Sequence, residues 1–132
     1  MPSRRIVIDH ITVGVRDLAA SRVFYLAALA PLGFVEQAPW SEDAEDVGFG
    51  PPGLDDFYIS TRYTTVGGAH IAFAADSHEQ VDAFHRAALA AGGRDNGAPG
   101  PRLEYSPGYY GAFVLDPDGN NVEAVWHDPA GI

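Results

Sequence analysis

Cysteine and lysine are both absent from this chain of 132 residues, and methionine occurs only once. Without cysteine the chain has no disulfide, no thiolate metal ligand and no cysteine nucleophile. No apolar run approaches the roughly 18 to 20 residues that cross a bilayer, and no apolar signal region follows the N-terminal arginines. We therefore expect a cytoplasmic protein without a membrane partner.

Positive charge is also scarce, since 8 arginines face 18 acidic residues and give a formal net charge of −10. A basic surface supplies most of the affinity of nucleic-acid-binding proteins, so this balance argues against a nucleic acid partner. It leaves a small anionic substrate possible, because one buried arginine can outweigh a diffuse negative field. The length is that of one domain, which we expect to comprise residues 1–132.

The chain contains an internal repeat with a constant offset of sixty positions. His10 corresponds to His70, Phe24 to Phe84, and the run 27–30 to the run 87–90. In all, eight of the twenty-four positions from 10 to 33 are identical to their counterparts. Ordinary residue usage would give roughly one or two such matches. We infer two copies of one supersecondary unit, at about 6–64 and 67–128.

Each copy reads as a strand, a helix and then three strands. In the first copy a branched-chain strand precedes Asp17, a plausible helix N-cap, and Pro31 ends the helix. The expected strands of this copy are 6–15, 32–35, 47–49 and 57–62. In the second copy the helix follows Ser77, and an Asp-Pro-Asp-Gly turn joins the last two strands. The strands expected there are 69–75, 109–115 and 121–127.

A glycine- and proline-rich segment separates the second helix from this final hairpin. It runs from 94 to 108, contains Arg102 and Tyr105, and is expected to be an irregular lid over a site. By two-residue alternation, His10, His70 and Glu123 lie on the face of the sheet that the helices leave open. We assign Tyr110 to the same face and consider it a candidate proton donor.

Two histidines and one carboxylate on an open sheet face form a donor set for a divalent metal. Neutral imidazole and carboxylate suit iron, manganese, nickel, cobalt or zinc, and three protein ligands leave positions for substrate. Each residue alone is more often hydrogen-bonded or solvated than metal-bound. The shared phase of His10 and His70 and the matching parity of Glu123 favour the metal. Parity does not establish that the three side chains meet.

Three stretches carry a resemblance to a known family: 9–11 (DHI), 69–73 (AHIAF) and 110–123 (YGAFVLDPDGNNVE). They are similar to the vicinal oxygen chelate superfamily, which includes glyoxalase I, fosfomycin- and bleomycin-resistance proteins, methylmalonyl-CoA epimerase and extradiol dioxygenases. The resemblance implies an α+β fold of two βαβββ modules, with a curved mixed sheet and helices on its outer face. It also implies that His10, His70 and Glu123 are the metal ligands.

The resemblance is weaker below the superfamily level. Glyoxalase I would add a fourth ligand, usually glutamate, on the fourth strand, where this chain has 57–62 (FYISTR). Fosfomycin-resistance enzymes carry a basic set for the phosphonate, and this chain has no lysine. Bleomycin-binding relatives lack the metal ligands. Relatives of this size commonly form homodimers, so the three ligands could come from one chain or from two.

Two main functions remain open. The first is a metal-dependent enzyme of the lyase, isomerase or ring-cleaving type, acting on a small compound that chelates the metal through neighbouring oxygens. In it, Tyr110 is the catalytic candidate, and Arg102, Tyr105 and Tyr110 contact the substrate. The second is a protein that binds a small molecule without turnover, as bleomycin-resistance proteins do. Resistance to a toxin or an antibiotic overlaps with both.

Overall fold

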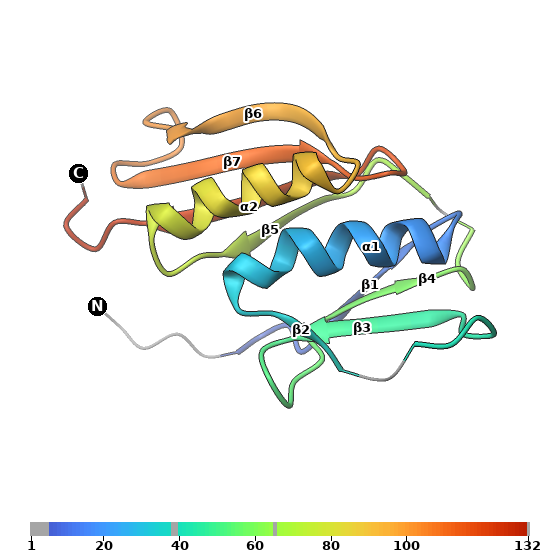
Figure 1. The fold of residues 1–132 in the computed structure, drawn as a ribbon. Coiled ribbons are helices and arrows are strands. Elements are labelled where there is room, and N and C mark those ends of the chain that lie inside the picture. Colours follow the sequence, from blue (N-terminus) through green and yellow to red (C-terminus); the bar gives the residue numbers. More distant parts are fainter. Residues whose placement is uncertain (1–5, 38–39, 65, 132) are drawn as a thin grey trace.

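A computed structural model describes residues 6–37, 40–64 and 66–131, and it contains the predicted unit twice (Figure 1). The first module comprises β1 (Ile11–Gly14), α1 (Leu18–Leu29), a 3₁₀ turn (Ala30–Leu32), β2 (Val35–Glu36), β3 (Asp46–Gly50) and β4 (Phe57–Ser60). The second comprises β5 (His70–Ala74), α2 (His78–Ala90), β6 (Arg94–Pro101), β7 (Tyr109–Leu115) and β8 (Asn121–His127). The predicted α+β class and the order of elements are confirmed.

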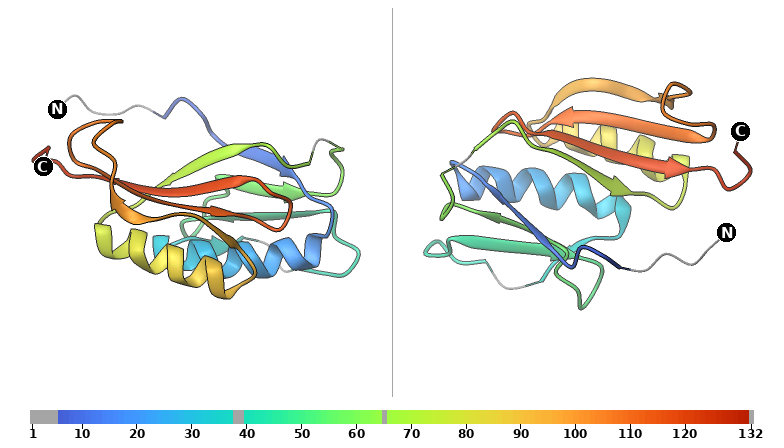
Figure 2. Two further views of the ribbon diagram at one scale, coloured as in Figure 1. Left: turned by 90° about the horizontal axis from the view of Figure 1, so that it is seen from above. Right: turned by 180° about the vertical axis from the view of Figure 1, so that it is seen from behind.

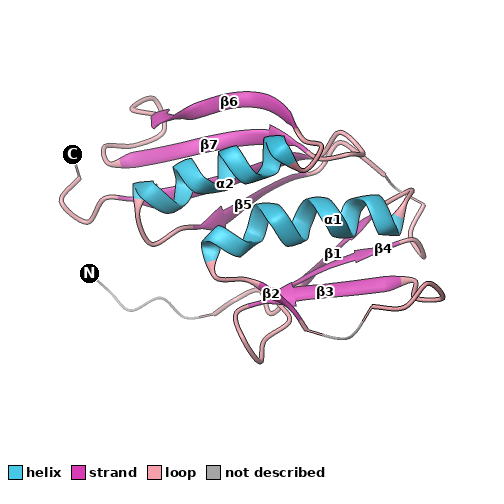
Figure 3. Ribbon diagram, viewed as in Figure 1, coloured by secondary structure: helices cyan, strands magenta, loops and turns pink. Residues whose placement is uncertain are grey.

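Each module forms its own four-stranded mixed sheet. The strand orders are β1-β4-β3-β2 and β5-β8-β7-β6, with the first strand of each module parallel to its last. The two helices lie together on one side of both sheets, as the views in Figures 2 and 3 show. The opposite side, which we call the open face, carries the candidate site. The edge strands β1 and β5 belong to separate sheets rather than to the single continuous sheet expected.

The core lies between the helices and the sheets and is built from corresponding residues of the two modules. Phe24 of α1 and Phe84 of α2 are both fully buried. On the strands, Val13 and Phe73 turn towards the helices, while Thr12 and Ala72 alternate to the open face. The alternation predicted for β1 and β5 is therefore confirmed.

The turn between β7 and β8 links the modules through a buried carboxylate. Asp116, only 3% exposed, accepts backbone hydrogen bonds from Asp118 at 2.9 Å and Asn120 at 2.8 Å. Its other oxygen accepts from the hydroxyl of Tyr25 in α1, at 2.5 Å. Burial, and then the negative charge of Asp116, raise the pKa of Tyr25 well above its usual value. The predicted turn therefore also joins the two halves of the molecule.

Several sequence-based expectations were wrong in detail. The expected strand 32–35 is replaced by the 3₁₀ turn Ala30–Leu32 and the short strand Val35–Glu36. The first strand begins at Ile11 rather than at residue 6, and residues 6–10 have no regular structure. The segment from 94 to 108 is not irregular throughout, because Arg94–Pro101 forms the edge strand β6. Glycine and proline are tolerated there because only one side of β6 is paired, and the register shifts around Gly97.

No helix among the described residues is long and apolar enough to cross a membrane.

Candidate functional site

The second module brings together two of the three predicted metal ligands. β5 runs parallel to β8 with Ala72 opposite Glu123, so His70, two residues earlier, projects from the same open face. The Nε2 atom of His70 lies 2.8 Å from Oε1 of Glu123. Glu123 is 1% exposed, whereas the His70 side chain is 53% exposed. A buried carboxylate therefore meets an imidazole that solvent and ligands can reach.

Tyr109 completes this cluster and was not predicted. Its hydroxyl donates a hydrogen bond to Oε2 of Glu123, the carboxylate oxygen that His70 leaves free. Gly111 lies between them, and a Cβ there would come within 3.2 Å of that oxygen. Burial, followed by the hydrogen bond to Glu123, raises the pKa of Tyr109 above its usual value. The phenol therefore remains protonated at neutral pH and acts as a hydrogen-bond donor.

Tyr110 does not lie on the open face, so the sequence-based assignment of its orientation was wrong. In the antiparallel pair of β7 and β8, Tyr110 lies opposite Trp126, whereas Glu123 lies opposite Phe113. The Tyr110 hydroxyl donates to Asp82 of α2 at 2.7 Å, on the helix side. Burial and then this bond raise the pKa of Tyr110 to about 12. The proton-donor and substrate-contact roles expected of Tyr110 required its side chain to lie on the open face, where it does not lie.

Arg102 and Tyr105, the other predicted substrate contacts, lie next to the cluster in the second module. The guanidinium carbon of Arg102 lies 5.5 Å from the centre of the Phe113 ring. The ring of Tyr105 meets that of Tyr109 edge-on at 5.0 Å, and Tyr105 is 60% exposed. Both residues belong to the connection that follows β6, which is shorter than the irregular segment that the sequence predicts.

His10, the third predicted ligand, lies just before β1 in a different setting. Its Nδ1 is 2.8 Å from the carboxylate of Asp9, and this hydrogen bond raises the pKa of His10. Its ring lies 5.8 Å from that of Tyr58, whose hydroxyl donates to Asp55. These residues border a polar hollow of about 460 Å³, together with Thr12, Asp46, Arg62 and Tyr63.

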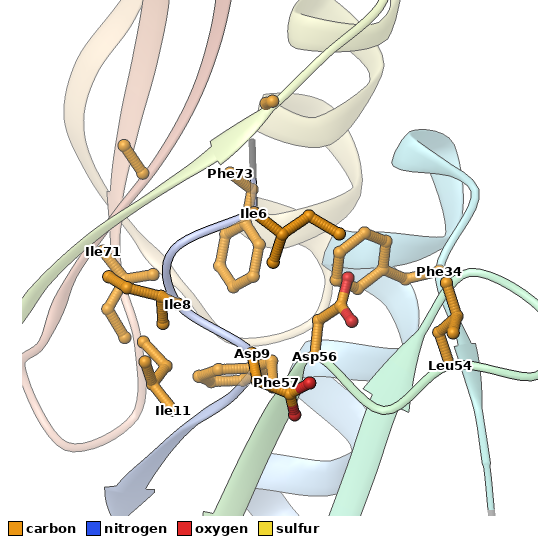
Figure 4. A pocket seen from close by; sticks show the side chains of 12 residues that line it. Ile6, Ile8, Asp9, Ile11, Phe34, Leu54, Asp56, Phe57, Ile71 and Phe73 are labelled. Atoms are coloured by element: carbon orange, nitrogen blue, oxygen red, sulfur yellow. The ribbon is translucent and has the colours of Figure 1, made fainter. Parts of the chain in front are cut away.

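Within one chain, His10 is separated from the pair formed by His70 and Glu123. An apolar groove of about 500 Å³ lies between the two modules, lined by Ile8 and Ile11 of the first and by Ile71 and Phe73 of β5 (Figure 4). No group of three histidine or acidic side chains that could hold a metal occurs among the described residues. The donors are of the right kind, but one chain supplies only two of them.

Most of the chain matches one protein family. The model of the Glyoxalase/Bleomycin resistance protein/Dioxygenase superfamily covers residues 7–124, so the chain belongs to this superfamily. Its members include lyases and dioxygenases and typically use divalent metals. The sequence-based assignment to the vicinal oxygen chelate proteins is thereby confirmed.

Individual relatives agree with this assignment. The uncharacterized protein YqjT of Bacillus subtilis (strain 168) is 34% identical over 125 residues, which cover 88% of this chain and 95% of YqjT. A glyoxalase/bleomycin resistance protein from Albidiferax ferrireducens T118 is 35% identical, with a TM-score of 0.74 over 91% of this chain and 98% of its own. Lactoylglutathione lyase from Agrobacterium tumefaciens has a TM-score of 0.67 over 94% and 96% of the two chains; at 20% identity it shares the fold alone.

Proposed function

We propose that this protein is a metal-dependent enzyme acting on a small oxygenated compound that chelates the metal through neighbouring oxygens. The observation that carries the proposal is the contact between His70 and the buried carboxylate of Glu123 on the open face. Burying a carboxylate is costly unless it is paired, and a divalent cation would compensate its charge more fully than a hydrogen bond. The superfamily supports lyase, isomerase or ring-cleaving chemistry.

The third ligand in this proposal is His10 of a second copy. His10 and His70 occupy equivalent positions of the repeat, yet among the described residues His10 does not join His70 and Glu123 in one group of ligands. Residues Ile6, Val7 and Ile8, just before His10, are 82%, 80% and 67% exposed. Apolar side chains this exposed favour burial against another protein surface. A homodimer would cover them and bring a His10 to each pair of His70 and Glu123.

In this site each residue has a definite task. His70, Glu123 and the second copy's His10 would hold iron, manganese, nickel, cobalt or zinc. When bound, the metal supplies Lewis acidity towards the substrate's oxygens. Tyr109 replaces Tyr110 as the candidate proton donor, because its protonated hydroxyl touches Glu123 on the open face. Its proton would pass to a developing oxyanion of the substrate, and the phenolate left on Tyr109 would take up a proton from water.

A specific observation also favours the second candidate, binding of a small molecule without turnover. Both oxygens of Glu123 already have partners, His70 on one and Tyr109 on the other. A carboxylate satisfied in this way needs no metal. In that case the same open face would bind a ligand through hydrogen bonds and aromatic contacts alone.

Metal titration of single and mixed variants tests the proposal. We expect calorimetry with Mn²⁺, Ni²⁺ or Zn²⁺ to show strong binding to the wild type and none to His70→Ala or His10→Ala. The control His78→Ala, which changes a histidine of α2, should bind as the wild type does. If the site spans two copies, unfolding and refolding an equal mixture of the two inactive variants should restore about a quarter of the wild-type sites, because half of the dimers regain one intact site.

Other outcomes separate the alternatives. Metal binding that survives His70→Ala contradicts the proposal. If the wild type binds no metal and a small-molecule ligand binds His70→Ala normally, the function without turnover is correct. A mixture that stays inactive, although each variant still forms dimers, places all three ligands within one chain.

A further inference from the structure

Arg102 is fixed in an unusual way beside the cluster of His70, Glu123 and Tyr109. It is the first residue after β6, and its backbone N–H donates to the carbonyl of Tyr109 at 2.8 Å. Its Nη2 donates to the carbonyl of Ala98 at 2.6 Å, and its Nη1 to that of Pro101 at 3.2 Å. The side chain therefore folds back along β6, with its position set by backbone carbonyls.

The sequence of β6 leaves room for this arrangement. A Cβ at Gly97 would come within 2.9 Å of the Phe113 ring and 3.4 Å of Nη2 of Arg102. At Gly100 it would come within 3.3 Å of Nη1. Gly97 also has a φ of +154°, which side chains rarely adopt. Glycine at these two positions allows the guanidinium to lie against the strand and beside the Phe113 ring.

Arg102 differs from the other arginines that make side-chain bonds, because none of the acidic side chains that the structure describes pairs with it. Arg16, Arg22 and Arg62 pair with Asp118, Glu36 and Asp46. Among the described residues no acidic side chain lies within salt-bridge distance of Arg102, although the chain has 18 acids. A guanidinium has five N–H donors, and the two carbonyls of Ala98 and Pro101 take two of them.

The guanidinium is also near the proposed metal ligands. Phe113 lies directly opposite Glu123 in the pair of β7 and β8, so both side chains project from the open face. The centre of the Phe113 ring lies 5.5 Å from the guanidinium carbon of Arg102 and 6.2 Å from the centre of the His70 ring. Arg102 and His70 thus flank one aromatic ring.

We infer that Arg102 binds a carboxylate of the substrate, so that the substrate is a small organic acid whose carboxylate is separate from its metal-chelating oxygens. This inference rests on the proposed function, because the chelating oxygens define where the rest of the substrate lies. A guanidinium fixed beforehand, charged and without an acidic partner is suited to hold a carboxylate through two parallel hydrogen bonds. Phe113 provides an apolar surface for the part of the substrate between the two groups.

Two matched probes test the inference: 3,4-dihydroxybenzoate and its methyl ester. Both present the same neighbouring oxygens on the same ring, and only the acid carries a carboxylate. Calorimetric titration of the metal-loaded wild type should show the acid binding at least about ten-fold more tightly than the ester, as charge-assisted hydrogen bonds predict. Arg102→Gln should remove this preference and leave the affinity for the ester unchanged.

Two further variants separate recognition from structure. Arg102→Lys keeps the charge without the planar fork and should retain part of the preference. Arg86→Gln, an equal change of charge on an exposed residue of α2, should retain all of it. If Arg102 only supports the loop, Arg102→Gln will weaken both probes alike, and the inference is wrong. Equal affinity of the wild type for acid and ester overturns it without any variant. If metal-loaded protein binds neither probe, the proposed function fails as well.

Discussion

The two modules have the same strand pairing, but they place different chemistry at one equivalent position. Thr12 of β1 lies opposite Tyr58 of β4, and Ala72 of β5 lies opposite Glu123 of β8. Because Ala72 is the repeat counterpart of Thr12, Tyr58 occupies in the first module the position that Glu123 occupies in the second. This is also the strand on which glyoxalase I would be expected to carry a fourth ligand.

The exchange of a carboxylate for a phenol separates the roles of the two modules. The hydrogen bond to Asp55, followed by burial, raises the pKa of Tyr58, so its hydroxyl remains a donor at neutral pH. Glu123 is an acceptor and a potential metal ligand. A repeat can therefore keep its backbone while the equivalent position on its last strand carries a carboxylate acceptor in one copy and a phenol donor in the other.

The outer strands of the two modules differ in length, and this difference also gives the modules different side chains beside the open face. β2 contains two residues, whereas β6 contains eight and leads directly into Arg102. The longer strand carries the glycines against which the guanidinium lies. Within the described residues β2 has no corresponding extension, so the proposed carboxylate contact belongs to the second module.

The largest expected difference concerns two leucines at equivalent positions of the repeat. Leu29 of α1 is fully buried, whereas Leu89 of α2 is 36% exposed. We expect Leu29→Ala to lower the free energy of unfolding by about 3 kcal/mol, because it leaves a cavity in the core. Leu89→Ala should lower it by less than about 1 kcal/mol. Urea denaturation measures both values, and equal losses would show that the helices are buried to the same extent.

The repeat predicted most of the fold, because the offset of sixty positions marks the features that set local structure. The helix caps Asp17 and Ser77, the core residues Phe24 and Phe84, and the strand-helix-strand-strand-strand order all follow from it. It could not predict how the modules pack, since that depends on contacts between them. For this reason it could not predict whether His10 joins His70, and Glu123, which has no counterpart at that offset, was predicted from strand parity and from the resemblance instead.

The error over Tyr110 had a simpler cause. Alternation along β7 alone does not fix the face on which Tyr110 lies, whereas the pairing of β7 with β8 through the turn does. Counting outwards from the turn places Phe113 opposite Glu123, and Tyr109 then shares the face of the carboxylate. The sequence alone therefore contained enough information to place Tyr109 on the open face. The position of the Arg102 side chain could not be predicted in this way, because it depends on register shifts in β6 that composition does not reveal.

Substitutions at these two equivalent positions test whether Glu123, and not Tyr58, binds the metal. Glu123→Gln should weaken metal binding at least about 100-fold, because it removes the only charged ligand while keeping the shape of the side chain. Tyr58→Phe should change metal affinity less than about three-fold, because a protonated phenol contributes little to coordination. Metal titration by calorimetry measures both. A large loss in Tyr58→Phe would make the tyrosine a ligand and restore the equivalence of the modules.

The smallest expected difference distinguishes the two helix caps. Asp17 accepts a hydrogen bond from the backbone N–H of Ala20 at 3.1 Å, and Ser77 accepts one from Gln80 at 3.2 Å. Replacing either with alanine should cost about 1 kcal/mol. Asp17 also places a negative charge at the positive end of α1, a contribution that salt screens. The loss caused by Asp17→Ala should therefore shrink by a few tenths of a kcal/mol in 1 M NaCl, in urea denaturation measured with and without the salt, as screening of exposed charges predicts. The loss caused by Ser77→Ala should stay constant, and an equal response to salt would mean that the charge of Asp17 adds nothing to its hydrogen bond.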